Sequence, residues 1–291
     1  MKQFSVAFLI LCLLFPLLAL ADCPLYKDLS DEEASRLLDA DTPVLEIVFP
    51  SIAGCDACIL RLGDATMMID GGSEYMASHG VRAALQAMGI THIDTAFCTH
   101  PHDDHVRGFA ALCAQGYTFG RMVLCFDENS NYHIRLASRA VRSTGGSIEY
   151  ISDGDVLSLG DALFTMIQRT GADFTVNDLS GILRLTYGDA TFLFTGDIEN
   201  RAQSALLADP PACGLKADLL KHPHHGYAPI LPELLTAIQP QFVVITGIQD
   251  HISQATALLN HLSIPWARPW NQTLRFRTDG HVWVLDTLSP R

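Results

Sequence analysis

The chain has 291 residues, of which 32 are acidic and 19 are basic, so its formal net charge at pH 7 is −13. Such an excess of negative charge repels polyanions at long range and disfavours a nucleic-acid-binding protein built around a basic groove. The length suits one large domain with a substantial core, and no internal repeat or low-complexity linker divides the chain.

The first 21 residues have the pattern of a secretory signal peptide. Lys2 precedes an apolar run over residues 6–20, and small residues before Asp22 offer a cleavage site after Ala21. The run is shorter than the roughly 20 residues that a membrane-spanning helix needs. An uncleaved anchor and a lipid attached at Cys23 are the alternatives. We therefore predict a secreted or extracytoplasmic protein with no transmembrane segment after cleavage.

Seven cysteines follow the predicted cleavage site, an odd number that leaves at least one thiol unpaired. Cys55 and Cys58 have the spacing of redox motifs and zinc ribbons. Because no second CxxC pair accompanies them, we predict a local structural disulfide or two packed thiols at this position.

After a lead-in over residues 22–43, which contains a helix over 30–39, the main domain covers residues 44–291. Hydrophobic runs and turn residues predict strands over 44–49, 57–63, 65–72, 92–100, 121–127, 147–152, 155–160, 162–168, 181–188, 190–197, 217–222 and 242–247, and a terminal hairpin over 273–286. Helical patterns cover 74–89, 106–116, 134–142, 200–208, 232–238 and 253–262. Runs of strands mixed with strand–helix units favour an α/β protein with layered sheets and helices outside.

The stretch "THPHDDHVRG", Thr99 to Gly108, follows one of these strands and places three histidines and two aspartates within six residues. So many polar groups are costly to bury without a partner, and a metal ion is the simplest one. His100 and His102 leave an extended segment on the same face and can share one ion. Asp104 and His105 lie where the chain turns and can face a second ion.

Other polar clusters follow strands elsewhere in the chain, at Asp70, Asp197 and His224-His225. A carboxylate at Asp197 could bridge two cations, and one of the two adjacent histidines would close the second site. Two ions roughly 3.5–4 Å apart activate a bridging water as hydroxide near neutral pH and polarise an electrophilic oxygen. The pattern therefore predicts hydrolysis without a covalent enzyme intermediate.

These residues resemble a known family. "HPHDDH" fits the HxHxDH signature of the metallo-β-lactamase fold, and "MMIDGG" and "FLFTGDIE" resemble its first-aspartate and bridging-aspartate motifs. The flanking "CDACILRLGDATMMIDGG", "NDLSGILRLTYGDATFLFTGDIE" and "DLLKHPHHGY" are more similar to hydrolases related to the DNA-uptake protein ComEC and to phosphorylcholine esterases. The resemblance implies an αββα sandwich of two mixed β-sheets with helices on the outer faces.

The resemblance also implies the roles of individual residues. His100 and His102 would bind the first metal, Asp104 and His105 the second, and Asp197 both, while Asp70 would brace the loop that holds the cluster. His225 is assigned to the second metal. His224 is assigned to the phosphate or leaving group of the substrate, and the reverse assignment of these two histidines stays open. The predicted catalytic residues are Asp104 and His224, and the predicted cofactors are two divalent ions, zinc first and manganese as the alternative.

One departure from the family concerns the first metal, which usually has a further histidine ligand before the bridging aspartate. This chain has no histidine between His133 and His222. Gln168, Asp173, Asn177 or a water could fill the position, and such a change of donor moves the preference toward manganese.

The predicted function is that of a secreted metal-dependent hydrolase that uses a metal-bound hydroxide. Its expected substrate is a phosphodiester or phosphate ester in nucleic acid, teichoic acid or a small metabolite, although the net charge argues against stable nucleic-acid binding. The alternatives are a β-lactam hydrolase and a non-catalytic domain that retains the fold.

Overall fold

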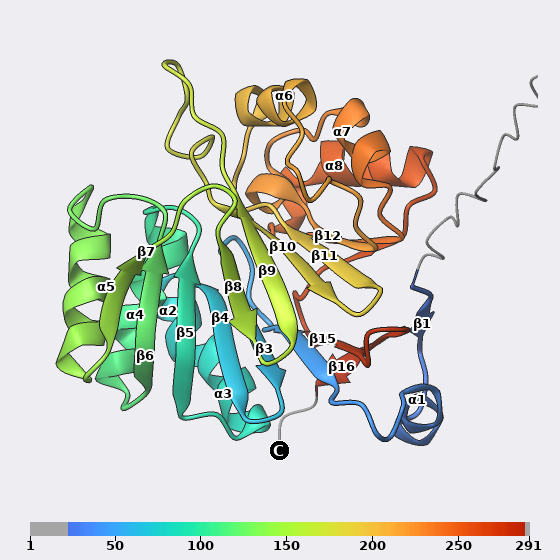
Figure 1. Cartoon of the computed structure of the whole chain (residues 1–291), viewed down its shortest axis with the longest axis horizontal. Coiled ribbons are helices and arrows are strands. Elements are labelled where there is room, and N and C mark those ends of the chain that lie inside the picture. Colours follow the sequence, from blue (N-terminus) through green and yellow to red (C-terminus); the bar gives the residue numbers. More distant parts are fainter. Residues whose placement is uncertain (1–22, 289–291) are drawn as a thin grey trace, which may run out of the picture.

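The computed structural model describes residues 23–288, which form two mixed β-sheets packed face to face with helices outside (Figure 1). The nine-stranded sheet has the order β1-β16-β15-β2-β3-β4-β5-β6-β7, and the seven-stranded sheet has the order β14-β13-β12-β11-β10-β9-β8. The bounds of the strands are β1 Leu25–Lys27, β2 Leu45–Phe49, β3 Ala57–Leu62, β4 Ala65–Gly71, β5 His92–Cys98, β6 Thr118–Leu124, β7 Ser147–Tyr150, β8 Val156–Leu159, β9 Ala162–Ile167, β10 Ile182–Tyr187, β11 Ala190–Phe194, β12 Leu219–Lys221, β13 Phe242–Val244, β14 Trp266–Ala267, β15 Thr273–Thr278 and β16 Trp283–Leu288.

The helices form the two outer layers. Their bounds are α1 Asp31–Leu37, α2 Glu74–Met76, α3 Arg82–Met88, α4 Asp103–Ala114, α5 Tyr132–Ser143, α6 Asn200–Ala208, α7 Pro232–Ile238 and α8 Ser253–His261. Helices α3, α4 and α5 cover the nine-stranded sheet, and α6, α7 and α8 cover the seven-stranded one (Figure 1). Aromatic residues such as Phe192 and Phe276 fill the space between the sheets. The predicted αββα sandwich is therefore confirmed.

Most predicted elements are present with small shifts at their ends, and the differences have local causes. The helix expected over 74–89 is one continuous helical segment, but residues Ala77–Val81 form a π-helical turn between α2 and α3. Gly80 lies in this turn, where a Cβ would come within 2.7 Å of the Ser51 carbonyl oxygen. The helix therefore approaches the neighbouring loop more closely than any other residue type at position 80 would allow.

The lead-in is part of the main sheet. Its expected helix is α1, which a Ser30–Glu33 capping box begins, and the unexpected strand β1 pairs in parallel with β16. The predicted signal peptide lies outside the described residues. Within residues 23–288, no helix is long and apolar enough to cross a membrane.

Cys55 and Cys58 are two separate buried thiols, and the other cysteines of residues 23–288 are free as well. The side chain of Cys55 packs in the layer between the nine-stranded sheet and its helices, whereas that of Cys58 packs between the two sheets. Because the two sulfur atoms belong to different layers, the local disulfide considered from the sequence does not form.

Candidate metal centre

Strand ends from both sheets bring the polar clusters together. Strands β4 and β5 run parallel and end next to Asp70 and His100, while β11 and β12 run parallel and end next to Asp197 and the two histidines at 224 and 225. Hydrogen bonds join the two sheets at this edge, such as that from the Gly181 amide to the Thr99 carbonyl oxygen at 2.8 Å. Segments more than 100 residues apart in the chain thus form one cluster.

Helix α4 positions the middle of the signature. His102 is its extended N-cap residue, so Asp104 and His105 occupy the first turn. The helix lies against the end of β4, where the Gly108 amide donates to the Gly72 carbonyl oxygen at 2.8 Å. A Cβ at Gly108 would lie 1.7 Å from the Gly71 oxygen, so only glycine permits this approach.

Four side chains form a tight group of donor atoms that corresponds to the predicted second metal site. His225 Nε2 lies 3.1 Å from Asp104 Oδ2 and 3.2 Å from Asp197 Oδ2, and His105 Nε2 lies 3.3 Å from Asp197 Oδ2 and 3.9 Å from Asp104 Oδ2. The two Nε2 atoms are 3.3 Å apart. Ligands 2.0–2.2 Å from a tetrahedral ion have edges of about 3.3–3.6 Å, so this group has the size of a zinc site.

Carboxylates fix the tautomers of the two histidines. His105 Nδ1 lies 2.8 Å from Asp70 Oδ2, and His225 Nδ1 lies 3.0 Å from Asp56 Oδ1. When Nδ1–H donates to a carboxylate, the neutral ring keeps its Nε2 lone pair, which is the arrangement typical of histidines that bind metals. Both lone pairs are directed at Asp197.

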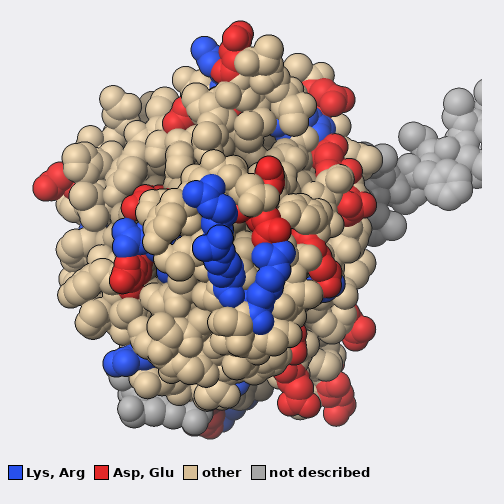
Figure 2. All heavy atoms as spheres, turned by 90° about the vertical axis from the view of Figure 1, so that its left-hand side faces the viewer, with Lys and Arg blue, Asp and Glu red and all other residues tan. Residues whose placement is uncertain are grey.

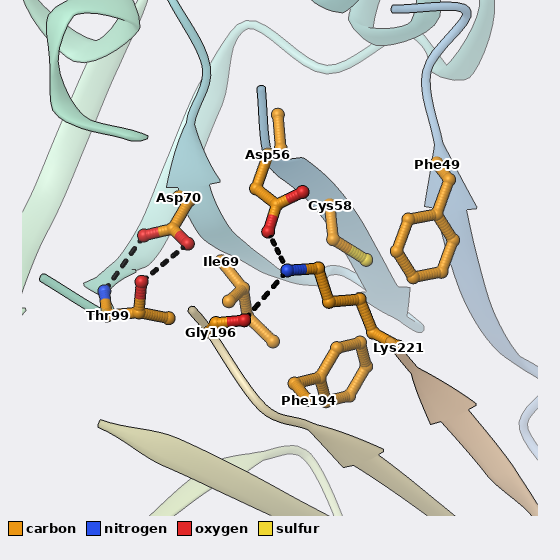
Figure 3. Close-up of a pocket in the computed structure, with 10 residues that line it drawn as sticks. Phe49, Asp56, Cys58, Ile69, Asp70, Thr99, Phe194, Gly196 and Lys221 are labelled. Carbon is orange, nitrogen blue, oxygen red and sulfur yellow. Dashed lines mark hydrogen bonds and ion pairs between the residues drawn. The ribbon is translucent and has the colours of Figure 1, made fainter. Parts of the chain in front are cut away.

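Asp70 also braces the signature loop, as the sequence predicted. Its carboxylate accepts hydrogen bonds from the Thr99 amide and the Thr99 hydroxyl, both at 2.8 Å (Figure 3). Asp70, His224 and His225 all have positive φ angles, between 46° and 57°. Residues other than glycine rarely adopt this conformation, and it concentrates at functional sites.

Asp56 and Lys221 are charged residues of the site that the sequence analysis missed. The Lys221 ammonium is buried, forms an ion pair with Asp56 and donates to the Gly196 carbonyl oxygen at 2.9 Å (Figure 3). It also lies 3.4 Å from Asp197 Oδ1. Asp56 also accepts from the Thr246 hydroxyl at 2.5 Å. Although Asp56 lies close to the donor group, its oxygens already have these partners, so Asp104 is the better fourth ligand.

These contacts shift the pKa values of the buried groups. Burial opposes protonation of His105, but Asp197 and Asp70 outweigh it and raise the pKa of His105 to about 10. The pKa of His225 rises in the same way because of Asp197 and Asp56. Although burial favours the neutral acid, His225, His105 and Lys221 hold the pKa of Asp197 well below its usual range. Asp197 is therefore an anion, as a bridging ligand requires.

The predicted first site is more open. His100 Nε2 lies 3.0 Å from His102 Nδ1 and 3.9 Å from Asp197 Oδ2, the oxygen that also faces the second site. His100 is buried and its Nδ1 lies 3.0 Å from the Thr99 hydroxyl, whereas His102 is only partly buried. The structure thus brings the six predicted metal ligands into one cluster, in which His100, His105 and His225 face the same Asp197 oxygen.

The proposed substitutes for the missing histidine lie elsewhere. Gln168 donates to the Leu179 carbonyl oxygen at 2.6 Å, Asp173 is exposed, and Asn177 donates to Glu199 Oε1 at 2.9 Å. Within the described structure, none of these three residues forms a hydrogen bond or ion pair with His100 or His102, and neither does His133. His224 Nε2, by contrast, lies 3.9 Å from Asp197 Oδ2.

The donor set fits the divalent ions that the fold implies. Around His105 and His225 lie four carboxylates, namely Asp56, Asp70, Asp104 and Asp197, and a single ammonium, that of Lys221. With neutral histidines the formal charge is −3, which is costly to bury without cations. Two divalent ions would change this charge to +1.

Sequence signals for the missed residues are weak. Asp56 precedes a strand, and Lys221 ends an apolar strand directly before the histidine cluster. Glu199 follows Asp197 by two residues, and its Oε1 lies 3.2 Å from His224 Nδ1. Only the lysine, a charge at the end of an otherwise apolar strand, stands out in the sequence alone.

Comparisons with known proteins agree with this architecture. Residues 53–117, which include Asp70 and the histidine signature, match the family model of the Metallo-beta-lactamase superfamily. No curated protein matches the sequence.

Similar solved structures share the fold at low sequence identity. The metallo-β-lactamase fold protein YhfI from Bacillus subtilis has a TM-score of 0.54 at 14% identity, over 78% of this chain and 96% of that one. An E377D mutant of the β-hydroxylase CmlA has a TM-score of 0.50 at 16% identity, over 82% and 56% of the two chains. A diphosphatase from the PhnP family has a TM-score of 0.47 at 14% identity, over 77% and 94%. The two-sheet architecture is thus that of the metallo-β-lactamase fold, and residues 53–117 match the superfamily model.

Proposed function

We propose that the protein is a metal-dependent hydrolase of phosphodiesters or phosphate esters. The observation that carries this proposal is the group of Asp104, His105, Asp197 and His225, in which the histidine Nε2 atoms lie 3.1–3.9 Å from the carboxylate oxygens. His100 and His102 extend the group on the far side of Asp197. The set therefore has room for two ions with a shared carboxylate.

When bound, two divalent ions supply Lewis acidity and lower the pKa of water so that it attacks near neutral pH. The residues of the chain hold and orient this centre. Asp104, His105 and His225 bind from one side, Asp70 and Asp56 fix the two imidazole rings, and Lys221 holds the second oxygen of Asp197. Asp104 is also partly exposed, so it borders the space in which water and substrate meet.

The charge of the centre favours an anionic substrate. Two divalent ions leave the inner cluster with a formal charge of +1, which attracts a phosphate group. The motifs around Asp70, Asp197 and His225 resemble the branch of ComEC-related hydrolases and phosphorylcholine esterases, which favours phosphoester cleavage over β-lactam hydrolysis. The fold alone does not choose between these reactions.

A hollow beside the centre supports a small substrate. It has a volume of about 360 Å³ and is lined by Thr175, Asp178, Glu199, Asn200, Arg201, Ala228 and Pro229. This size suits a small molecule. Arg201 is the basic side chain of the lining; it is exposed and donates to the Asp173 carbonyl oxygen.

A long nucleic acid fits the surface less well. Figure 2 shows basic side chains close together on the face formed by α5, with acidic side chains beside them. Some of the basic side chains on α5 and the neighbouring strand β6 have acidic partners. Arg142 of α5 forms an ion pair with Glu128, and Arg121 of β6 forms one with Glu149. We infer that the substrate binds through its phosphate at the metal centre. We also infer, from the signal-peptide pattern of residues 1–21, that the enzyme acts outside the cytoplasm.

An activity panel tests the proposal. The purified protein is assayed with bis-p-nitrophenyl phosphate, p-nitrophenyl phosphorylcholine, DNA and nitrocefin, each with zinc and with manganese. We expect metal-dependent turnover of a p-nitrophenyl phosphate ester. Turnover of nitrocefin alone would instead indicate a β-lactamase, and a protein that binds neither metal would indicate a non-catalytic domain.

A further inference from the structure

The three histidines on the signature helix and in the "HPHHG" loop share one arrangement. His105, His225 and His224 each have Nδ1 next to a carboxylate oxygen, of Asp70 at 2.8 Å, Asp56 at 3.0 Å and Glu199 at 3.2 Å respectively. Each also has Nε2 near the same Asp197 oxygen, at 3.3, 3.2 and 3.9 Å. A carboxylate behind the ring and a metal in front of it form the usual surroundings of a metal-binding histidine.

His224 faces the Asp197 oxygen that the two predicted sites share. The Nε2 atoms of His100 and His224 both lie 3.9 Å from Asp197 Oδ2, whereas His105 and His225 lie closer to it and to Asp104. Because Asp104, His105, His225 and Asp197 already supply four donors to the second site, His224 is free to join His100 and His102 as a third imidazole of the first site. Three imidazoles and a carboxylate are a complete tetrahedral set for zinc.

Buried polar residues surround His224, although no hydrogen bond forms between His224 Nδ1 and Glu199. The Nδ1 atom is buried and makes no hydrogen bond in the described structure, although Glu199 Oε1 is 3.2 Å away. Asn177, itself buried, donates to the same Oε1 at 2.9 Å and so holds the carboxylate near the ring. A small rotation of Glu199 would complete the bond and leave the Nε2 lone pair facing the centre.

We infer that His224 is the third imidazole ligand of the first metal ion, and that Glu199, held by Asn177, is its positioning residue. This replaces the family histidine that is absent between His133 and His222, and it departs from the substrate-binding role expected from the sequence. The inference rests on the proposed function, because it takes a two-ion centre as given. Asn177 then acts through Glu199 and is no ligand itself.

Metal binding to the full mature chain tests the inference. Protein freed of metal with a chelator is titrated with Zn²⁺ and with Co²⁺ in a calorimeter, and bound metal is counted by elemental analysis. We expect two ions for the wild type and one ion for His224→Ala, with the remaining ion bound at wild-type affinity. Free imidazole added to His224→Ala should restore the second ion. Glu199→Gln should weaken the same ion by roughly 10–100-fold, as the loss of an outer carboxylate usually does.

His251→Ala is the matched control, because His251 is exposed and its ring lies 5.7 Å from that of Tyr227, outside the donor group. It should bind two ions. If His224→Ala keeps both ions with unchanged affinity and loses only turnover, His224 contacts substrate and the inference is overturned. If His224→Ala does not fold, an unchanged affinity in Glu199→Gln overturns it equally. A wild-type protein that binds no metal would overturn the proposed function as well.

Discussion

The two halves of the metal centre differ in how firmly their ligands are held. On the second-metal side, His105 and His225 are buried and each ring is fixed by a carboxylate within 3.0 Å of Nδ1. On the first-metal side, His102 is partly exposed and the side chain of His224 is 26% exposed with an unsatisfied Nδ1. One half is thus preorganised before any ion binds, and the other is adjustable.

This difference indicates that a single carboxylate can bridge two metal sites of unequal affinity. Ligands that are already oriented lose less conformational entropy when an ion binds, so the second site should be the tighter one. Both halves border the solvent, the tighter one at Asp104 and the looser one at His102 and His224. We therefore expect a chelator to remove metal in two steps, with activity lost in the first.

Removal of the shared carboxylate of Asp197 should abolish the difference in metal affinity between the two sites. Asp197 Oδ2 lies within 3.9 Å of the Nε2 atoms of His100, His105, His224 and His225, so Asp197→Ala should lose both ions and all measurable hydrolysis. The protein should remain folded because little core volume is lost. Metal content and circular dichroism are the measurements. Near-wild-type turnover would show that the metal assignment is wrong.

Removal of one histidine from either half should separate the two sites. His102→Ala should lose one ion and His225→Ala the other, and each variant should lose more activity than the roughly 10–100-fold typical of an outer-shell change. The ion that remains should be held more tightly in His102→Ala than in His225→Ala. Calorimetric titration of the two variants compares these affinities. Equal values would contradict the prediction that the second site binds its ion more tightly than the first.

The elements around these two halves could be predicted from the sequence because their signals are local. Helix α6 has the predicted bounds, as does α7, which begins at a proline in its first turn. Strand β1 has only three residues and β14 only two. Such short strands are stabilised by pairing with distant partners and leave no periodic pattern to read.

The site shows the same division between local and distant signals. The six predicted metal ligands lie in short sequence motifs, so their spacing alone allows the prediction. Asp56 and Lys221 form an ion pair across the two sheets at a sequence separation of 165 residues. Neither sequence segment alone indicates this pair. The role of His224 likewise depends on Glu199 and Asn177, which the fold brings to it.

Changes to the carboxylates behind the rings should have smaller effects on the tighter half. Asp70→Asn and Asp56→Asn keep the shape of the side chain but weaken the acceptor for His105 and His225 respectively. Each should lower the affinity of the second ion by roughly 10–100-fold and leave the first ion nearly unchanged. Competition with a chromophoric chelator measures both affinities. A loss confined to the first ion would reverse the assignment of the halves.

In the metal-free protein, the preorganised second-metal half should make the free energy of unfolding depend on pH. Because carboxylates raise the pKa of His105 to about 10 in the folded state, its stabilising proton is fully present below the unfolded value near 6.5. Between pH 6.5 and 8, the free energy of unfolding should therefore fall by about 1 kcal/mol per pH unit. Urea unfolding at several pH values measures the slope. The metal-loaded protein should lack it, because an ion replaces the proton, and equal slopes in both forms would contradict this account.

The smallest effect on the centre should come from the thiols beside Asp56. Cys58 lines a cavity of about 20 Å³ that it shares with Asp56 and Lys221 (Figure 3), whereas Cys55 faces the helical layer. Burial raises the pKa of Cys55 to about 11 and holds the pKa of Cys58 well above its usual range, so both remain neutral thiols that contribute no charge.

Cys55→Ser/Cys58→Ser should therefore retain two ions and wild-type affinity, while burial of two hydroxyl groups lowers the free energy of unfolding by roughly 1–3 kcal/mol each. Cys98→Ser, which changes a buried thiol on the other side of the signature loop, is the matched control for the loss of stability. Elemental analysis and urea unfolding of the two proteins give both quantities. Loss of an ion from the folded double variant alone would mean that these thiols support Asp56, and through it His225, more directly than their neutral side chains imply.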